Sequence, residues 1–338
     1  MSISFIQKIY EGNNLPLPEQ GNYENILSLL EKDGVSPQVY YLLKERGLLG
    51  DTPIFFQEGL RRLYQESLFL NLYIKNQQTR ILECFEESRV EVIPLKGTLF
   101  AEKYYGDLGA RATSDIDLLI KVQDLTEAVQ IVKSLGFSMD HVQIKNHFHI
   151  SLCKDIPGSS IPLTVELHWD LLWKRTANLN INDFWNHALV TGGYRYVKEL
   201  SGFLTFYFIC LHGWRHNMDS PKYFLDIIQV AEVLGSEMDY HELLTVAKKH
   251  QTLKRIIRTL SIVSFHFLNL DHFISLPKRR TAMWWDAHPV VKDTQPNKVK
   301  SYLDFIDYQF FSYDKVHHTV REVVNWIGYG REGISRTK

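Results

Sequence analysis

Two aspartates separated by a single residue are the strongest candidates for chemistry in this sequence. Asp115 and Asp117 belong to the apolar segment 114–120, which predicts a β-strand. Because side chains alternate along a strand, both carboxylates point to one face while Ile116 and Leu118 point to the other, toward a core. Two neighbouring carboxylates repel each other unless a cation lies between them. Oxygen ligands on a strand suit Mg²⁺, which takes one or two carboxylates together with substrate phosphates.

A third carboxylate, Glu166, lies on a later predicted strand, residues 161–169, where it shares one face with His168. If this strand lies beside the strand of the aspartate pair, Glu166 completes a three-carboxylate site that can hold two metal ions. His168 would then orient a carboxylate or contact a substrate, and a partly buried packing role is the alternative. For the carboxylates, the alternative is a solvated strand end or an exposed position of the alternating pattern.

A possible phosphate-binding turn precedes the aspartate pair. Lys96, Gly97 and Thr98 lie between a predicted strand at 90–95 and a predicted short helix at 98–105. The N-terminus of a helix offers free backbone N–H groups and the positive end of a dipole, which favours phosphate. Gly97 would let the backbone approach closely, Lys96 would add a positive charge, and Thr98 would offer a hydroxyl.

The order of the predicted helices and strands that position these residues indicates an α+β fold. A small mixed β-sheet core lies between helical regions. Apolar residues at three- and four-residue intervals indicate helices before residue 90 and again from 203 onward. Pro94 predicts that the first strand lies at a sheet edge or ends early. We therefore divide the chain into an N-terminal helical region (1–89), an α+β core (90–200) and a C-terminal helical domain (201–338).

These motifs, in this order, resemble the polymerase-β-like nucleotidyltransferase superfamily. They are Leu95-Lys96-Gly97, then Arg111 with Ser114-Asp115-Ile116-Asp117, then Glu166-Leu167-His168-Trp169. More narrowly, residues from about 20 to 235 resemble a group of uncharacterised bacterial nucleotidyltransferases that carry a Leu-Lys-Gly motif. The resemblance implies a Mg²⁺-dependent transfer of a nucleoside monophosphate from a nucleoside triphosphate, with ATP expected, to an acceptor hydroxyl. Pyrophosphate would be released.

The resemblance also assigns roles to individual residues. Asp115, Asp117 and Glu166 match the metal-binding and catalytic carboxylates. The nucleotide contacts that it implies are Lys96, Gly97, Thr98, Ser114, Arg111 and Lys222. The superfamily usually has Gly-Ser or Gly-Gly at the phosphate turn, so Gly97-Thr98 departs from the pattern.

Two of these nucleotide contacts also have ordinary structural explanations. Arg111 could instead form a structural ion pair with an acidic neighbour. Lys222 lies four residues before Asp226, a spacing that also suits a simple ion pair within one helix.

Composition and charge limit the classes of partner. A net charge of −1 and a pI near 6.9 provide no basic field for a long nucleic acid. The sequence lacks an apolar run of the roughly 20 residues that span a bilayer, and its N-terminus does not have the pattern of a signal peptide, so we expect a cytoplasmic protein without membrane attachment.

The acceptor is open between a small metabolite, a sugar, a protein side chain and an RNA end. Two other function classes fit the same residues. One is a catalytically inactive nucleotide-binding regulator, or a protein that acts only with a partner. The other is a metal-dependent phosphohydrolase that uses the same acidic cluster.

Overall fold

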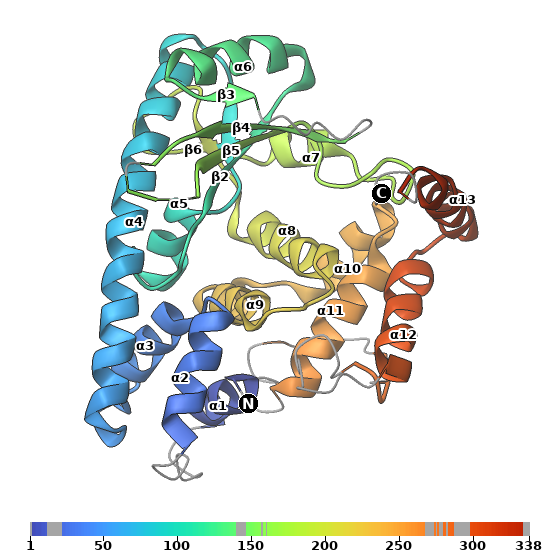
Figure 1. Ribbon diagram of the computed structural model, residues 1–338. Coiled ribbons are helices and arrows are strands. Elements are labelled where there is room, and N and C mark those ends of the chain that lie inside the picture. The colour runs from blue at the N-terminus through green and yellow to red at the C-terminus, as the bar shows by residue number, and fades with distance from the viewer. Residues whose placement is uncertain are drawn as a thin grey trace. The chain divides into compact units, whose positions relative to one another are not determined.

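The chain folds into two compact units, coloured along the sequence in Figure 1. In this computed structural model the first unit comprises Met1–Leu171 with Ile181–Thr205, and the second comprises Leu172–Asn180 with Phe206–Lys338. The structure describes residues 2–11, 22–139, 147–156, 158–159, 161–267, 274, 276, 280–281, 283–286 and 298–333. In these ranges, no helix combines the length and the apolar character that a membrane crossing requires.

A mixed five-stranded sheet forms the centre of the first unit, which confirms the predicted α+β fold. Its strand order is β1 (Val92–Pro94), β2 (Asp115–Ile120), β5 (Leu163–His168), β4 (His149–Lys154) and β3 (Ser138–Met139). β2 and β5 pair in parallel, and the other pairs are antiparallel. β1 lies at an edge and ends at Pro94, as predicted. The two-residue β3 was not predicted, because so short a strand carries no alternating pattern.

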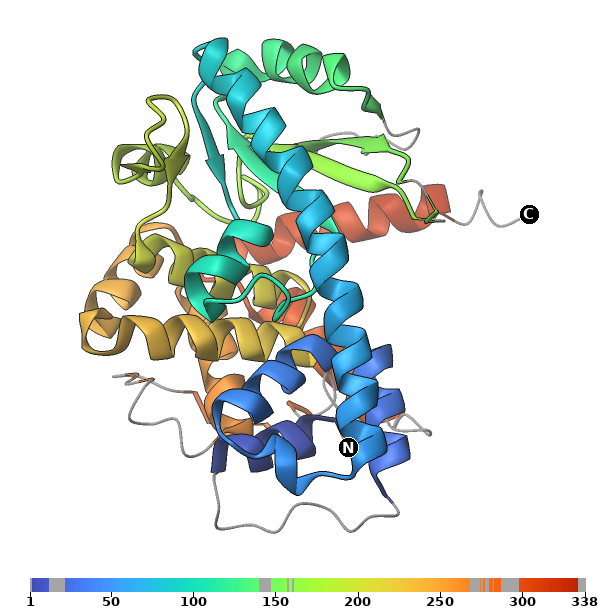
Figure 2. The same cartoon turned by 90° about the vertical axis from the view of Figure 1, so that its left-hand side faces the viewer.

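Two helices cover one face of this sheet, and this arrangement decides where the polar side chains go. α4 (Ile54–Glu87) passes across the sheet, and α6 (Leu125–Ser134) lies beside the upper end of α4 in Figure 2. Alternation along β2 and β5 turns their apolar residues toward these helices and leaves polar residues on the opposite face. The shared core includes Ile74, Ile81, Leu82 and Phe85 of α4, Ala128 and Val132 of α6, Ile116, Leu118 and Ile120 of β2, and Val165 and Leu167 of β5.

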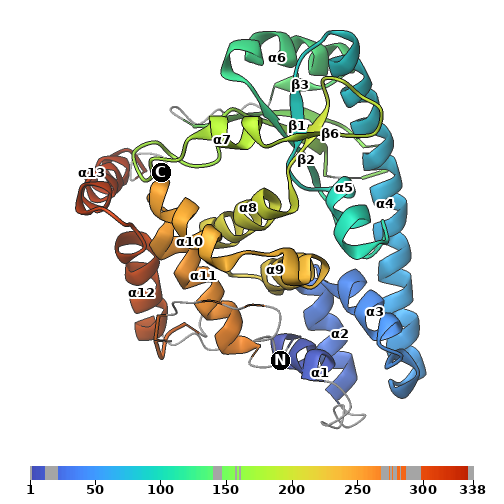
Figure 3. The same ribbon diagram turned by 180° about the vertical axis from the view of Figure 1, so that it is seen from behind.

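The N-terminal helices pack on the other half of α4, in the same unit as the sheet (Figure 3). They are α1 (Ser2–Glu11), α2 (Tyr23–Lys32) and α3 (Ser36–Glu45). An aromatic cluster joins them to α4, with ring centroids 5.6 Å apart for Phe5 and Phe56 and 4.9 Å apart for Tyr23 and Phe56. Pro37 lies in the first turn of α3, where proline is tolerated because the N–H that it lacks has no partner within the helix.

Short elements complete the first unit around the sheet. A three-residue helix, α5 (Thr98–Phe100), continues into a π-helical segment, Ala101–Tyr105, in place of the regular helix expected there. A second, two-stranded sheet is formed by β6 (Leu189–Val190) and β7 (Lys198–Glu199), after α7 (Ile181–Asn186). α8 (Gly202–Arg215) begins in the first unit and ends in the second.

The second unit is helical in the part that the structure describes. Its helices after α8 are α9 (Pro221–Leu234), α10 (Tyr240–Lys249), α11 (Leu253–His266), α12 (Lys298–Ile306) and α13 (Val316–Gly333). α11 carries two buried arginines. Arg255 lies over the Trp214 ring at 4.2 Å, and Arg258 pairs with Asp304 at 2.9 Å. Three prolines and many charged residues at 277–298 predict a looser segment, and most of it lies outside the described residues.

We expect His266, at the end of α11, to make stability depend on pH. Burial, opposed in part by a backbone hydrogen bond at Asp286, lowers its pKa to about 4. Between pH 4 and about 6.5 the unfolded chain binds a proton that the folded chain does not. Protonation of His266 in the unfolded chain therefore does not lower the free energy of unfolding well above pH 6.5, and lowers it by about 2 kcal/mol at pH 5. Urea unfolding at pH 7.5 and pH 5 measures it.

His266→Gln should lose this part of the pH dependence, whereas the exposed His241 provides the control variant His241→Gln. An unchanged pH dependence in His266→Gln would show that this side chain is not the source.

Candidate active site

The parallel pairing of β2 and β5 brings the predicted carboxylates together on the polar face of the sheet. The register places Asp117 opposite Glu166. His168 lies between them, with its Nε2 atom 3.1 Å from Asp117 Oδ1 and 3.1 Å from Glu166 Oε2. Asp115 begins β2 and its side chain is 29% exposed, whereas that of Asp117 is 3% exposed. The site therefore has a buried carboxylate at its base and an accessible one at its rim.

Lys96 lies against both aspartates. Its Nζ atom is 3.2 Å from Asp115 Oδ2 and 2.9 Å from Asp117 Oδ2. The backbone N–H of Leu95 donates to the carbonyl of Asp117 at 3.0 Å, which holds the turn beside β2. The ammonium group of Lys96 is therefore paired with both carboxylates in this structure, and its predicted contact with phosphate stays a prediction.

Charge compensation shifts the pKa values of these groups strongly. Burial by itself would lower the pKa of Lys96, but the charges of Asp117 and Asp115 outweigh it and raise that pKa. Burial would raise the pKa of Asp117, but Lys96 and the hydrogen bond from His168 hold it well below its ordinary value. Asp117 thus stays ionised although it is buried, because the ammonium group of Lys96 lies beside it.

His168 shares in this compensation. Burial opposes its charged form, but hydrogen bonds to Asp117 and Glu166 outweigh burial and raise its pKa. Burial likewise opposes the ionised form of Glu166, and the hydrogen bond from His168 lowers the pKa of this carboxyl. Of the three roles considered for His168, its contacts favour orientation of the carboxylates.

Gly97 adopts a backbone conformation that suits glycine, with φ of 91° and ψ of −140°. A side chain there would be strained by the positive φ, although a Cβ atom would meet the Asp115 carbonyl only at 3.5 Å. Thr98 is fully buried, and its hydroxyl donates to Gln78 Oε1 of α4 at 2.6 Å. The Thr98 hydroxyl is therefore hydrogen-bonded to α4, and a contact between Thr98 and a phosphate stays a prediction.

The remaining predicted nucleotide contacts lie at different places. Ser114 is exposed beside Asp115, with 3.5 Å between Ser114 Oγ and Asp115 Oδ1. Arg111 is buried, and its guanidinium group lies 5.0 Å from the centre of the Phe100 ring. Lys222 lies in the first turn of α9, in the second unit, and its contact with a nucleotide stays a prediction.

Two amide side chains of α4 position the segments that flank the site, and sequence reasoning missed both. Asn71 Nδ2 donates to the carbonyls of Leu108 at 2.6 Å and Arg111 at 2.7 Å, and Asn71 Oδ1 accepts from the Thr113 N–H at 3.2 Å. Gln78, seven residues later on the same face of the helix, accepts from Thr98. The available signal was that both amides fall on the apolar stripe of α4.

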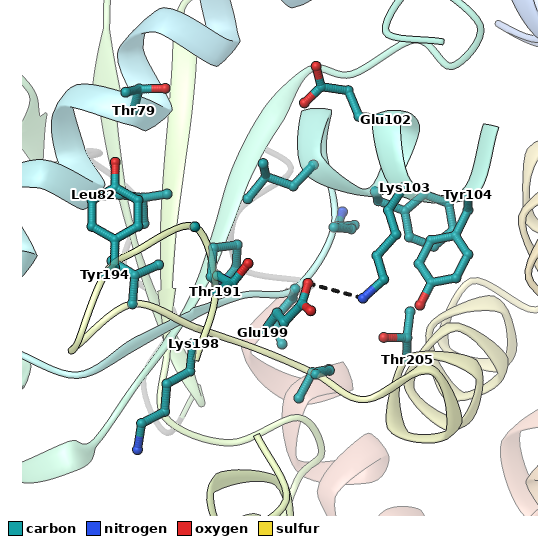
Figure 4. Close-up of a pocket in the computed structure, with 18 residues that line it drawn as sticks. Thr79, Leu82, Glu102, Lys103, Tyr104, Thr191, Tyr194, Lys198, Glu199 and Thr205 are labelled. Carbon is teal, nitrogen blue, oxygen red and sulfur yellow. Dashed lines mark hydrogen bonds and ion pairs between the residues drawn. The ribbon is translucent and has the colours of Figure 1, made fainter. Parts of the chain in front are cut away.

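A cavity of about 400 Å³ adjoins the carboxylates, because Lys96 lines it. It lies within the first unit, between the end of β1, the π-helical segment and residues 191–200. Figure 4 shows Lys103 paired with Glu199 in this cavity, Nζ to Oε2 at 3.0 Å, with Tyr104 and Thr205 beside them. The cavity has a volume suited to a small-molecule ligand.

The Glu86 carboxylate at the end of α4 fixes the wall of this cavity. It accepts from the backbone N–H groups of Arg195 at 2.8 Å, Tyr196 at 2.6 Å and Val197 at 3.3 Å. These hydrogen bonds lower the pKa of Glu86 although burial opposes the shift. One helix, α4, thereby anchors the loop before β2, the turn at Gly97 and the segment beside β7.

The mixed sheet of this α+β unit carries Asp115, Asp117 and Glu166 on one polar face, with a lysine-glycine turn beside them. This arrangement defines a candidate site for cation-assisted phosphoryl or nucleotidyl transfer. Residues 19–267 match the family described as uncharacterised nucleotidyltransferases, and the chain belongs to this family. The family membership supports a transferase that acts on a nucleotide. No curated protein and no solved structure matches the chain.

Replacement of Lys96 by methionine should destabilise the protein when divalent cations are absent. It leaves the buried, ionised Asp117 beside Asp115 with His168 as its remaining charged partner, which should cost about 3 kcal/mol of unfolding free energy. Urea unfolding in EDTA measures the loss, and added Mg²⁺ should restore part of it by binding the folded state.

Lys103→Met is the matched control for this loss. The Lys103–Glu199 pair is more exposed, so its loss should cost less than about 1 kcal/mol. Equal losses for the two variants would mean that Lys96 does not compensate a buried charge.

Proposed function

We propose that this protein is a Mg²⁺-dependent nucleotidyltransferase that moves a nucleoside monophosphate from a nucleoside triphosphate, with ATP as the first candidate, to an acceptor hydroxyl. The observation that carries this proposal is the β2–β5 register, which groups Asp115, Asp117 and Glu166 on one polar face beside Lys96. Membership of the nucleotidyltransferase family supports the same reaction class.

The side chains of the site fit Mg²⁺. The ammonium group of Lys96 lies within 3.2 Å of both aspartates, so this position already attracts a cation. Asp115, Asp117 and Glu166 would hold Mg²⁺, because it prefers oxygen ligands. When bound, Mg²⁺ would neutralise phosphate charge and make the α-phosphorus more susceptible to attack.

The reaction forms a bond between the acceptor oxygen and the α-phosphorus, and it breaks the bond from the α-phosphorus to the oxygen that leaves with pyrophosphate. The pKa values of Asp117 and Glu166 are lowered, so these groups stay ionised and act through their charge. Because a carboxylate with a lowered pKa is a weak base, the acceptor proton passes to solvent. Lys96, once released from the aspartates, can place its charge on the triphosphate because its side chain is long and flexible.

The cavity beside Lys96 is the candidate site for the nucleoside part of the donor. Its walls combine an aromatic ring, Tyr104, with polar groups at Lys103, Glu199 and Thr205. The rest of the wall is largely aliphatic and aromatic, and an apolar wall with a few polar groups suits a base with its ribose. Because Lys96 belongs to both the cavity and the carboxylate cluster, a nucleoside in the cavity would extend its phosphates toward the aspartates.

The alternative is a nucleotide-binding protein that is inactive alone or that requires a partner. One observation favours it: Lys96 fills the position between Asp115 and Asp117, where a metal ion would otherwise lie. In that case, nucleotide would bind without transfer.

We would incubate the protein with Mg²⁺, ATP labelled at the α- or the γ-phosphate, and a cell extract as the source of acceptor, and then repeat this with the other nucleotides. Transfer of the α-label with release of pyrophosphate is expected. Asp117→Asn should reduce it at least about 100-fold, because a ligand of the metal is lost. The control Asp155→Asn removes an exposed carboxylate outside the site and should leave transfer unchanged.

Other outcomes separate the alternatives. Transfer of the γ-label would indicate a kinase-like activity and overturn the proposal, and release of free phosphate without an acceptor would indicate a phosphohydrolase. Nucleotide binding by calorimetry without any transfer would favour the inactive or partner-dependent protein. Full transfer by Asp117→Asn would refute the assignment of the site.

A further inference from the structure

Two histidines flank Glu166 on the polar face of the sheet. The register of β4 and β5 places His149 directly opposite His168, with ring centroids 4.8 Å apart. His149 Nε2 lies 3.8 Å from Glu166 Oε1, and His168 Nε2 lies 3.1 Å from Glu166 Oε2. One nitrogen from each histidine and one oxygen from Glu166 all lie within 4.8 Å of one another. Three ligand atoms thus converge from two adjacent strands.

These distances are close to those of a coordination sphere. Ligand atoms about 2.1 Å from one ion lie roughly 3.0–3.5 Å from each other in tetrahedral geometry. The Glu166–His168 separation already falls in this range, and the Glu166–His149 separation is slightly longer. Small side-chain rotations would therefore bring the three ligands onto one ion, and the strands would not need to move.

The types of ligand select the class of metal. Imidazole nitrogen suits Zn²⁺, Fe²⁺, Ni²⁺ and Cu²⁺, whereas carboxylates and water suit Mg²⁺ and Ca²⁺. Two imidazoles and one carboxylate thus differ from the all-oxygen set at Asp115 and Asp117. Three protein ligands also leave a coordination position open, as in catalytic zinc sites.

The surroundings of the cluster are suited to holding an ion. The side chains of His149, Glu166 and His168 are 13%, 26% and 6% exposed, so the ligands are mostly desolvated and still reachable. The His147 ring packs edge-on against His149, with centroids 3.8 Å apart, which restricts the His149 ring. Asp117 Oδ1, 3.1 Å from His168 Nε2, connects this cluster to the aspartate pair.

We propose that His149, Glu166 and His168 form a binding site for a divalent first-row transition-metal ion of the Zn²⁺ type, next to the carboxylate pair Asp115 and Asp117. The inference concerns metal binding and does not rest on nucleotidyl transfer. Glu166 faces both groups, so it is the residue through which an ion in this site would influence the neighbouring one.

The test uses the full chain, stripped with EDTA and dialysed, without nucleotide. Zn²⁺ binding is followed by calorimetry, and Co²⁺ binding by its visible d–d absorption, which reports nitrogen and oxygen coordination. We expect one ion per chain. His149→Asn should weaken binding at least about 100-fold, because loss of a ligand exceeds the usual effect of altering its supporting residues.

Two further variants make the result specific. Asp155→Asn should keep Zn²⁺ affinity, because Asp155 is an exposed carboxylate outside both sites. His187→Asn removes an exposed histidine elsewhere in the first unit and should also keep it. Circular dichroism checks that each variant is folded, and His149→Gln replaces His149→Asn if the latter unfolds.

The outcomes separate this inference from the proposed function. Zn²⁺ binding that depends on His149 supports the inference whether or not nucleotidyl transfer is found. Absence of Zn²⁺ and Co²⁺ binding to the folded wild type, or equal affinity in wild type and His149→Asn, overturns it even if transfer is active.

Discussion

The parallel register between β2 and β5 is the constraint on which the rest of the site depends. It places Asp117 opposite Glu166, and alternation along both strands turns these side chains away from the core. A slip of one residue would bury the carboxylates against α4 and α6 and expose the apolar residues. The large apolar core on the other face prevents this slip, so the same burial that stabilises the unit also keeps the carboxylates on one face.

α4 connects this sheet to the segments that surround the site. Its apolar residues form part of the core, while Asn71, Gln78 and Glu86 hold the loop before β2, the turn at Thr98 and the segment at 195–197. Buried polar groups of this kind are stable only when they are hydrogen-bonded, so each one specifies a single position for its partner. The face that carries the candidate site is therefore aligned by a helix that packs on the opposite side of the sheet.

Sequence reasoning predicted the parts of this structure that are encoded locally. The alternation around Asp115 and Glu166 gave both strands and their polar faces, and Pro94 gave the edge strand. Contacts between residues that are far apart in the sequence could not be predicted from local patterns. Asn71 and Gln78 were missed because amides on a long helix usually face solvent, and His149 was missed because its proximity to Glu166 depends on the β4–β5 pairing. Lys96 was recognised, but its partners in this structure are carboxylates.

The ion pairs of Lys96 with Asp115 and Asp117 have a consequence for how the site would fill. A divalent ion that binds between the aspartates must displace the ammonium group of Lys96. The free energy needed to break those ion pairs lowers the affinity of the site for the ion. A polyphosphate that draws the ammonium away would remove this competition. By thermodynamic linkage each of the two ligands then strengthens the binding of the other. The site between the aspartates would therefore bind the cation and the polyphosphate cooperatively. When only one of them is present, Lys96 would stay paired with Asp115 and Asp117.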